Sequence, residues 1–217
     1  MSEHEIAIGG EVFRGRVLRK GIGPDFGDWF QEGLGKFSMP EPHVMEVDAI
    51  QGGYTAFIRK PLPADLLVRY RCKTLPPDGM NNINLISHCQ PPRPGEWPIV
   101  ELGRYKGYRE MPNYIVTFVS GKNEFEGIRE CPGRQRLRRN PGFALIEERE
   151  DVPSELGRQY EITFTALRGR LRYYIDGRKV FDWQDPQPIT GEGFFAFRTY
   201  KTHEVYSDLL ILGLEES

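Results

Sequence analysis

The chain has 217 residues and a formal net charge of −2, with 12% aromatic and 39% hydrophobic residues. This length suits one large β-rich domain, and the near-neutral charge gives no overall field that would attract nucleic acid or an acidic membrane. The 17 prolines and 24 glycines are spread along the chain, as expected for turns between short strands. We therefore expect a single domain over residues 1–217.

The cysteines and the N-terminal sequence bear on redox state and location. Cys72, Cys89 and Cys131 have no CxxC spacing, so neither a disulfide framework nor a zinc site is expected. The first fifteen residues contain no apolar segment typical of a signal peptide, and no stretch is long enough to span a bilayer. As given, the sequence predicts a cytoplasmic protein, whereas a signal peptide removed beforehand would mean a periplasmic or secreted one. No metal or other cofactor is predicted.

Strand signals recur along the chain, and helix signals are scarce. Residues 66–73 and 160–166 alternate apolar and polar side chains, which places one side of each strand in a core. Further strands are expected at residues 82–87, 114–120, 194–199 and 205–212. The pattern predicts an all-β, antiparallel sandwich of two sheets.

The clearest local signal is a hairpin centred on Asp176-Gly177, a pair that favours a two-residue type I′ turn. Regular pairing across this turn predicts Tyr173 on one face of the hairpin and Phe181 on the other. Two long segments are expected to be irregular, residues 90–111, rich in Pro, Gly and aromatic residues, and residues 122–142, rich in Arg. Long loops in a compact domain often carry function.

One strand combines amides with an imidazole. Asn82, Asn84, Ile86 and His88 fall on one face if the strand runs straight. Two amides and an imidazole on one face would suit a ligand rich in hydroxyl groups. The alternative is a histidine at the end of a strand that is satisfied by a nearby backbone group.

The second long segment brings several arginines together. In an extended chain Arg134, Arg136 and Arg138 share one side, and such a row repels itself unless an anion bridges it. A uronate or sulfate group would be a suitable anion, because the guanidinium fork matches it. Local partners such as Glu147 and Glu148 in a solvated loop are the alternative explanation.

Aromatic residues gather around the first long segment, namely Trp97, Tyr105, Tyr108 and Tyr114. Sugars present apolar C–H faces that stack on such rings, although simple tyrosine packing explains the same residues. Motifs of other chemistries are absent, including GxSxG, HExxH, the P-loop and GxGxxG. The four histidines have no second His or Cys at the spacing of metal ligands.

Five segments occur in a familiar order: NINLISH, NYIVTFVSG, RRNPGF, YYIDGRKVFDWQDPQP and GFFAFRTYKTHEVYSDLLI. Together they resemble the YesU-like, concanavalin A-like β-sandwich proteins associated with bacterial polysaccharide degradation, most strongly over residues 65–212. The resemblance implies a jelly-roll sandwich in which the concave sheet faces a saccharide. The wider fold hosts binding modules, glycosidases and lyases, so it does not decide the reaction.

Two functions are compatible with these residues. No strand carries the alternating acids of a retaining glycosidase, which disfavours hydrolysis. The first hypothesis is therefore a lyase or dehydratase that acts by β-elimination on oligosaccharides containing uronic acid. The second is a non-catalytic glycan-binding module or accessory protein. The partner is in both cases an acidic oligosaccharide or polysaccharide, and a homodimer is left open.

The candidate residues follow from these hypotheses. The predicted catalytic residues are His88, Tyr108, Tyr114 and Arg129. The predicted substrate-binding residues are Asn82, Asn84, Trp97, Asn113, Arg136, Arg138, Arg198 and His203.

Overall fold

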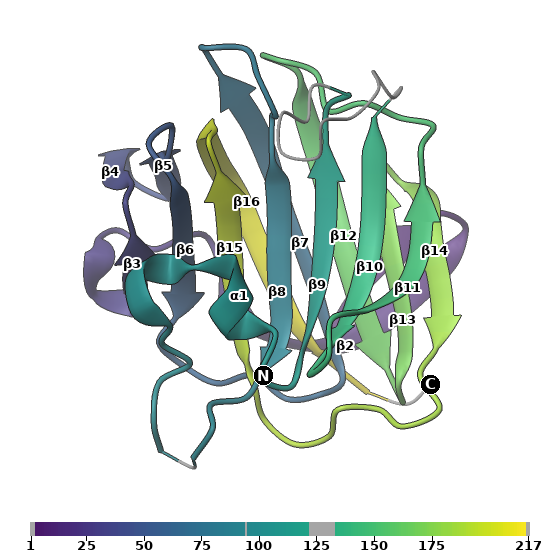
Figure 1. Cartoon of the computed structure of the whole chain (residues 1–217). Coiled ribbons are helices and arrows are strands. Elements are labelled where there is room, and N and C mark those ends of the chain that lie inside the picture. The colour runs from purple at the N-terminus through teal and green to yellow at the C-terminus, as the bar shows by residue number, and fades with distance from the viewer. Residues whose placement is uncertain (1–2, 94, 122–132, 216–217) are drawn as a thin grey trace.

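The computed structural model describes residues 3–93, 95–121 and 133–215, and the strands in these ranges form two antiparallel sheets (Figure 1). The first sheet has nine described strands. Its main path runs through β1 (Glu3–Ile8), β2 (Glu11–Lys20), β16 (His203–Leu214), β7 (Leu66–Leu75), β12 (Gln159–Leu167), β13 (Arg170–Ile175) and β14 (Arg178–Gln184). Strands β4 (Lys36–Glu41) and β5 (Val44–Asp48) extend it beside β16.

The second sheet has seven strands in the described ranges. Their order is β11 (Ala144–Arg149), β10 (Arg134–Asn140), β9 (Asn113–Val119), β8 (Ile83–Cys89), β15 (Phe194–Tyr200), β6 (Gly53–Ile58) and β3 (Trp29–Gly33). The prediction of an all-β antiparallel sandwich is confirmed.

Helices are short and few in the part of the chain that the structure describes. They are the 3-10 turns η1 (Phe26–Asp28) and η2 (Glu101–Gly103) and the single α-helical turn α1 (Tyr105–Tyr108). None of the helices in the described ranges is long and apolar enough to cross a membrane.

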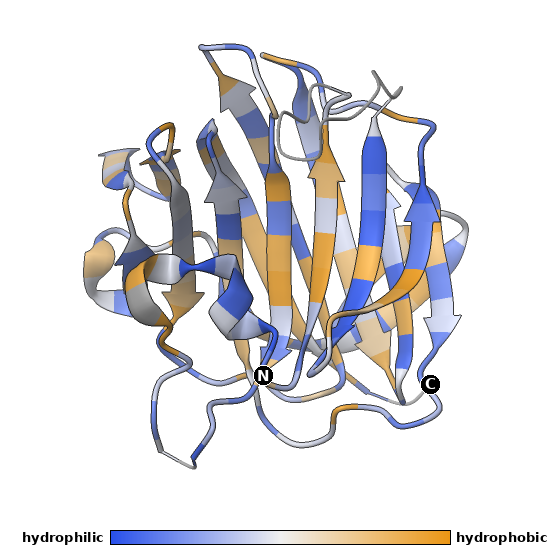
Figure 2. Ribbon diagram, viewed as in Figure 1, coloured by the Kyte–Doolittle hydropathy of each residue, from blue (hydrophilic) through white to orange (hydrophobic). Residues whose placement is uncertain are grey.

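The main core lies between the two sheets, where alternate side chains of facing strands meet. On β7, Tyr70 and Cys72 point into this core, while Arg69 and Arg71 point outward, as the alternating pattern predicts. Strands of the front sheet in Figure 2 accordingly show orange and blue positions in turn. Other segments of the chain cover parts of the outer faces of both sheets. Several outward-facing side chains are therefore buried as well.

The hairpin at Asp176-Gly177 has the predicted turn, with φ values of 51° and 75° at its two central residues. The predicted faces are wrong for the part of the hairpin that lies away from the turn. A β-bulge between Tyr173 and Tyr174 shifts the register, so that Tyr173 pairs with Phe181. Their rings stack at 6.0 Å in the main core, on the same face.

The segment at residues 122–142 is less irregular than expected. Strand β10 begins at Arg134 and pairs with both β9 and β11. The sequence shows no clear alternation of apolar and polar residues here, because Leu137 is the one apolar residue that β10 contributes to the core. The preceding residues 122–132 lie outside the described ranges.

Candidate functional site

The outer face of the seven-stranded sheet carries a continuous row of polar side chains. Cross-strand pairing aligns them from β3 to β10 in the order Glu32, Thr55, Arg198, Asn84, Thr117 and Arg136. Six strands thus contribute one residue each to a single line across the sheet. A row of polar groups at the middle of a sheet face is unusual for a surface that is largely buried.

The segment that carries η2 and α1 crosses this face and buries part of the row (Figure 1). The Tyr108 hydroxyl contacts the carboxylate of Glu32 and lies 3.0 Å from the hydroxyl of Thr55. The Asn113 amide group donates to the backbone oxygens of Tyr108 and Met111, both at 2.7 Å. Predicted site residues Tyr108 and Asn113 therefore hold the segment in place, and neither presents its polar group to a ligand.

Beside this segment lies a group that we call the arginine–tyrosine cluster, formed by Tyr105, Arg109, Arg138, Phe143 and Arg198. The Arg198 guanidinium carbon lies 4.6 Å from the centre of the Tyr105 ring. Those of Arg109 and Arg138 lie 3.6 and 3.9 Å from the centre of the Phe143 ring. Cation–π packing of this kind holds guanidinium groups in fixed positions.

The cluster has an excess of positive charge. Arg138 donates to the backbone oxygen of Phe143 at 3.1 Å and has no carboxylate within ion-pair distance among the described residues. Burial lowers the pKa of the Arg138 guanidinium, and the nearby charges of Arg136 and Arg109 lower it further. Arginine nonetheless stays protonated, so the cluster attracts an anion.

Two buried atoms of the polar row have unmet hydrogen-bonding capacity in the described structure. Arg198 is 3% exposed, and its Nε has no partner. Asn84, its cross-strand neighbour, is also 3% exposed, and its Oδ1 has no partner either, although its amide nitrogen contacts Asn82. Buried polar atoms are normally paired, so these two mark a place where a ligand or an ordered water would be stabilised.

Glu32 is the carboxyl nearest to Arg198 in the row. Burial raises its pKa, while the bonds from the Tyr108 hydroxyl and the Val100 amide and the charge of Arg198 lower it. Since Tyr108 and Val100 already occupy both carboxylate oxygens, Glu32 neutralises Arg198 only in part.

The predicted row of arginines on β10 divides into two parts. Arg134 pairs with Glu150, and Arg136 pairs with Glu148, as the hypothesis of local glutamate partners had proposed. Arg138 is different, because it faces Phe143 and Tyr105 instead of an acid. Of the three arginines in the predicted row, Arg138 is thus available to an external anion.

His88 does not share a face with Asn82, Asn84 and Ile86, so that prediction is wrong. Two residues of β8 stand opposite one of β15 at this point, because Ile86 pairs with Ala196 and Cys89 pairs with Phe194. His88 adopts a φ of 57° at the resulting bulge. Its ring therefore turns between the sheets, where it meets the rings of Tyr114 and Phe164.

The imidazole of His88 is fully engaged there. Its Nε2 lies 2.8 Å from the backbone oxygen of Ala64, so this nitrogen carries the proton, and its Nδ1 accepts from the Ser87 hydroxyl at 2.8 Å. Burial lowers the pKa of His88 to about 4. The expectation that a nearby backbone group satisfies this histidine is correct.

Tyr114 is also turned toward the core. Its hydroxyl donates to Asp185 at 2.6 Å and accepts from the amide of Ile189 at 3.0 Å. His88 and Tyr114 line a small hollow of about 160 Å³ between the sheets, which also touches Asp65 and Arg168. This hollow is separate from the arginine–tyrosine cluster, so the predicted catalytic residues do not converge on the outer face.

The other predicted residues lie in several places. Trp97 packs between Phe30 and Phe194, with ring centres at 5.6 and 5.4 Å. His203 is on the nine-stranded sheet, where its Nε2 lies 2.7 Å from Glu46. Asn82 is buried next to Asn84. Arg129 lies outside the described ranges.

Sequence reasoning had missed Arg109, Phe143 and Glu32 as members of this region. No motif could have found them, since they come from three segments that meet only in the folded chain. The described residues contain no group of three or more His, Cys, Asp or Glu side chains that could hold a metal ion.

Comparisons with known proteins agree on the fold. A family model described as "Domain of unknown function (DUF6250)" matches residues 49–209. No curated protein sequence matches the chain. A protein of unknown function with a galectin-like fold from Bacillus subtilis aligns over 100% of both chains, with a TM-score of 0.76 and 17% identity.

Two sugar-binding structures show the same architecture. The carbohydrate-binding module CBM66 from Bacillus subtilis aligns with a TM-score of 0.58 and 13% identity, over 85% of this chain and 95% of the module. The exoplasmic/lumenal domain of VIP36, bound to Ca²⁺ and Man3GlcNAc, has a TM-score of 0.66 and 11% identity, over 93% of this chain and 92% of that domain. These likenesses show a galectin-like, concanavalin A-like sandwich.

Proposed function

This chain belongs to the family described as a domain of unknown function, DUF6250, and we propose that it binds a carbohydrate without cleaving it. The fold supports a role with carbohydrate, since one structure of this architecture is a carbohydrate-binding module and another is a domain bound to Man3GlcNAc. Fold likeness does not identify a ligand, so the ligand must be argued from the site.

The position of the histidine favours binding over β-elimination. Elimination needs a base within hydrogen-bond reach of the sugar's α-proton. His88 and Tyr114 lie between the sheets and bond to protein groups, and Tyr108 is occupied by Glu32. The hollow at His88 holds about 160 Å³, which is too little for an oligosaccharide.

The observation that carries the proposal is the unbalanced charge of the arginine–tyrosine cluster. Arg138 has no carboxylate partner among the described residues, and the Nε of Arg198 has no hydrogen-bond partner. The half-buried Tyr105 ring contacts the guanidinium groups of Arg109 and Arg198. A carboxylate or sulfate on a sugar would pair with the guanidinium groups, while Tyr105 and Thr117 would contact the sugar ring. The ligand is therefore an acidic glycan.

Calorimetric titration with oligogalacturonates, and with neutral malto-oligosaccharides of the same length, tests this proposal. The acidic series should bind more tightly, and its affinity should fall as salt is added, because ions screen the attraction. Arg138→Ala should weaken binding about tenfold or more, as expected for one charge-assisted hydrogen bond. The matched control is Arg170→Ala, an exposed arginine on the other sheet that pairs with Asp182.

Product analysis separates binding from elimination. The oligogalacturonates should be recovered intact after long incubation, with no new absorbance from an unsaturated uronate. Appearance of that absorbance would establish a lyase, and equal affinity for neutral and acidic sugars would remove the arginine–tyrosine cluster from the proposal.

A further inference from the structure

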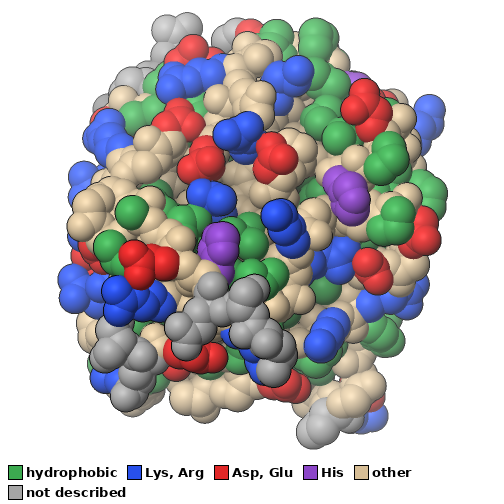
Figure 3. All heavy atoms as spheres, turned by 180° about the vertical axis from the view of Figure 1, so that it is seen from behind, with side chains coloured by type: hydrophobic (Ala, Val, Ile, Leu, Met, Phe, Trp, Pro, Cys, Tyr) green, Lys and Arg blue, Asp and Glu red, His purple; other side chains and the backbone are tan. Residues whose placement is uncertain are grey.

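A second polar hollow lies on the opposite side of the molecule, on the outer face of the nine-stranded sheet. It has a volume of about 890 Å³, and we call it the hairpin groove, lined by His4, Lys20, His43, Arg69, Arg71 and Asp208. Figure 3 shows this face, where basic, acidic and histidine side chains gather near the centre.

The β1–β2 hairpin forms one wall of the groove. It packs across the outer face of the sheet through Ile6, Ile8 and Phe13, which join a cluster with Tyr174 and Leu210. This packing covers one part of the face and leaves the neighbouring part open. His4 and Lys20 stand at the open side, one from each strand of the hairpin.

At the floor of the groove lies the middle of β16, which pairs with two different strands along one of its edges. The first residues of β16 pair with β5, up to Tyr206, and its last residues pair with β2, from Leu210 onward. Between them Asp208 adopts a φ of 53° at a bulge, and the Gly21 amide donates to the backbone oxygen of Leu209 at 2.6 Å. The groove lies over this bulge and over the neighbouring residues Arg69 and Arg71 of β7.

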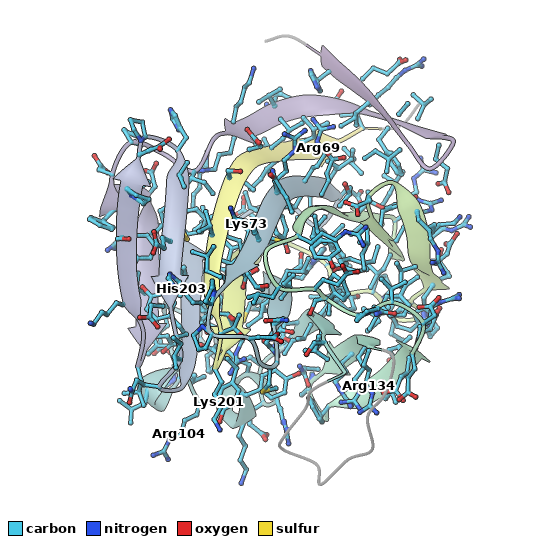
Figure 4. The ribbon with its side chains drawn as sticks, turned by 90° about the horizontal axis from the view of Figure 1, so that it is seen from above. Arg69, Lys73, Arg104, Arg134, Lys201 and His203 are labelled. Carbon is cyan, nitrogen blue, oxygen red and sulfur yellow. The ribbon has the colours of Figure 1, made fainter. Side chains whose placement is uncertain are left out.

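The charges in the groove are unevenly balanced. Arg71 lies 3.4 Å from Asp208 and 3.9 Å from Glu161, so both acids of the groove are close to the same arginine. Arg69 and Lys20 have no carboxylate within ion-pair distance among the described residues. Figure 4 shows that Arg69 lies on the side of the nine-stranded sheet, whereas Arg134 lies on the other sheet.

We infer that the hairpin groove is a second anion-binding site that takes a carboxylate or sulfate group of a saccharide, between Arg69 and Lys20. This inference rests on the proposed function for the class of ligand, but it uses no residue of the arginine–tyrosine cluster. Arg69 is half-buried on a rigid strand, so little side-chain entropy is lost when it pairs with an anion. The exposed His4 offers its ring nitrogens to the hydroxyl groups of the same sugar, and His43 offers its Nε2, because its Nδ1 already accepts from the Gly23 amide at 3.2 Å.

Two sites on opposite faces make a specific prediction about stoichiometry. Calorimetric titration of the full chain with hexagalacturonate should give two sites. Arg138→Ala should remove one of them, and the double variant Lys20→Ala/Arg69→Gln should remove the other. Each loss corresponds to an affinity at least about tenfold lower at that site. Lys36→Ala, an exposed lysine on β4, is the matched control.

The outcomes separate this inference from the proposed function. The inference is overturned if Lys20→Ala and the double variant both keep two sites. It is also overturned if the wild type has one site and only Arg138→Ala removes it. Loss of all binding in the double variant, with Arg138→Ala unchanged, supports the groove and refutes the cluster. A parallel titration with sodium sulfate distinguishes the ligand, because sulfate binding at the groove without hexagalacturonate binding overturns the assignment to a saccharide.

Discussion

The Tyr108 hydroxyl donates a hydrogen bond to the Glu32 carboxylate and thereby joins α1 to the edge strand β3. The same carboxylate accepts from the Val100 amide at 3.0 Å, so it ties two points of the covering segment to the sheet. Tyr105 and Arg109 belong to this segment and depend on its position. A bond within the protein thus controls the geometry of the proposed carbohydrate site.

Removing that hydroxyl should loosen the segment. Tyr108→Phe is expected to lower the free energy of unfolding by about 1–2 kcal/mol, because a buried bond to a charged group is lost. It should also raise the pKa of Glu32, since the bond from Tyr108 lowers it. Urea unfolding and NMR titration of Glu32 measure the two effects. Tyr54→Phe, which removes a bond to the neutral Gln31, should cost less and is the control.

Asn84 offers a way to place an internal anion in the site. Asn84→Asp puts a carboxylate next to Arg198, where Asn84 Oδ1 now has no partner. Its affinity for oligogalacturonates should fall about tenfold or more, and its melting temperature reports the balance between the new pair with Arg198 and the lost donor to Asn82. Calorimetry and thermal unfolding provide the readouts, and Asn82→Asp is the neighbouring control. Unchanged affinity would show that Arg198 takes no part in binding.

Glu204 should make the protein less stable as the pH rises. It is fully buried, the Tyr206 hydroxyl donates to it at 2.7 Å, and burial raises its pKa well above its usual value of 4.5. A raised pKa stabilises the fold below about pH 4.5, and this contribution is lost as the pH rises through the folded-state value. Between pH 5 and 8, urea unfolding should therefore show that Glu204→Gln becomes more stable relative to the wild type as the pH rises. The difference in unfolding free energy should grow by about 1.4 kcal/mol for each pH unit between 4.5 and the folded-state pKa of Glu204. Exposed Glu110→Gln should show no such trend.

His88 should act in the opposite direction at acidic pH. Its pKa is lowered from 6.5 to about 4, so its contribution to stability is complete above pH 6.5 and is lost as the pH falls toward 4. The expected loss over that window is about 3 kcal/mol. His88→Asn tolerates the positive φ and does not titrate, so its unfolding free energy should be flatter there. A slope unchanged from the wild type, with exposed His4→Asn as control, would assign the acid sensitivity to other groups.

The strands with strict alternation were predictable from the sequence, because burial on one face imposes a period of two. This holds for β7 and β12 and for the turn at Asp176-Gly177. The failures at His88 and near Tyr173 share one cause. Each is a bulge at which the period slips by one residue, and at His88 it places a non-glycine residue in the left-handed region. Because several types of residue tolerate this conformation, the sequence gives only a weak signal for it.

The proposed site was predictable only in its residue types. Arginine, asparagine and tyrosine were expected to meet an acidic sugar, and Arg138, Arg198 and Asn84 do lie close together in the described structure. Their approach depends on the strand order of the seven-stranded sheet, which brings β10 and β15 near the α1 segment. Arg109 and Phe143 could not be found in advance, because Arg109 ends a one-turn helix and Phe143 occupies a turn.

The bulge at His88 has a consequence for comparing members of this family. Between Ile86 and Cys89 the strand holds one residue more than its partner needs. A homologue that lacked this residue would hold one side chain on the core face there, opposite Phe195, in place of the pair Ser87 and His88. Alignments must therefore preserve the spacing between these two positions, since a single gap there would remove one partner of the hydrogen bond between Ser87 and His88.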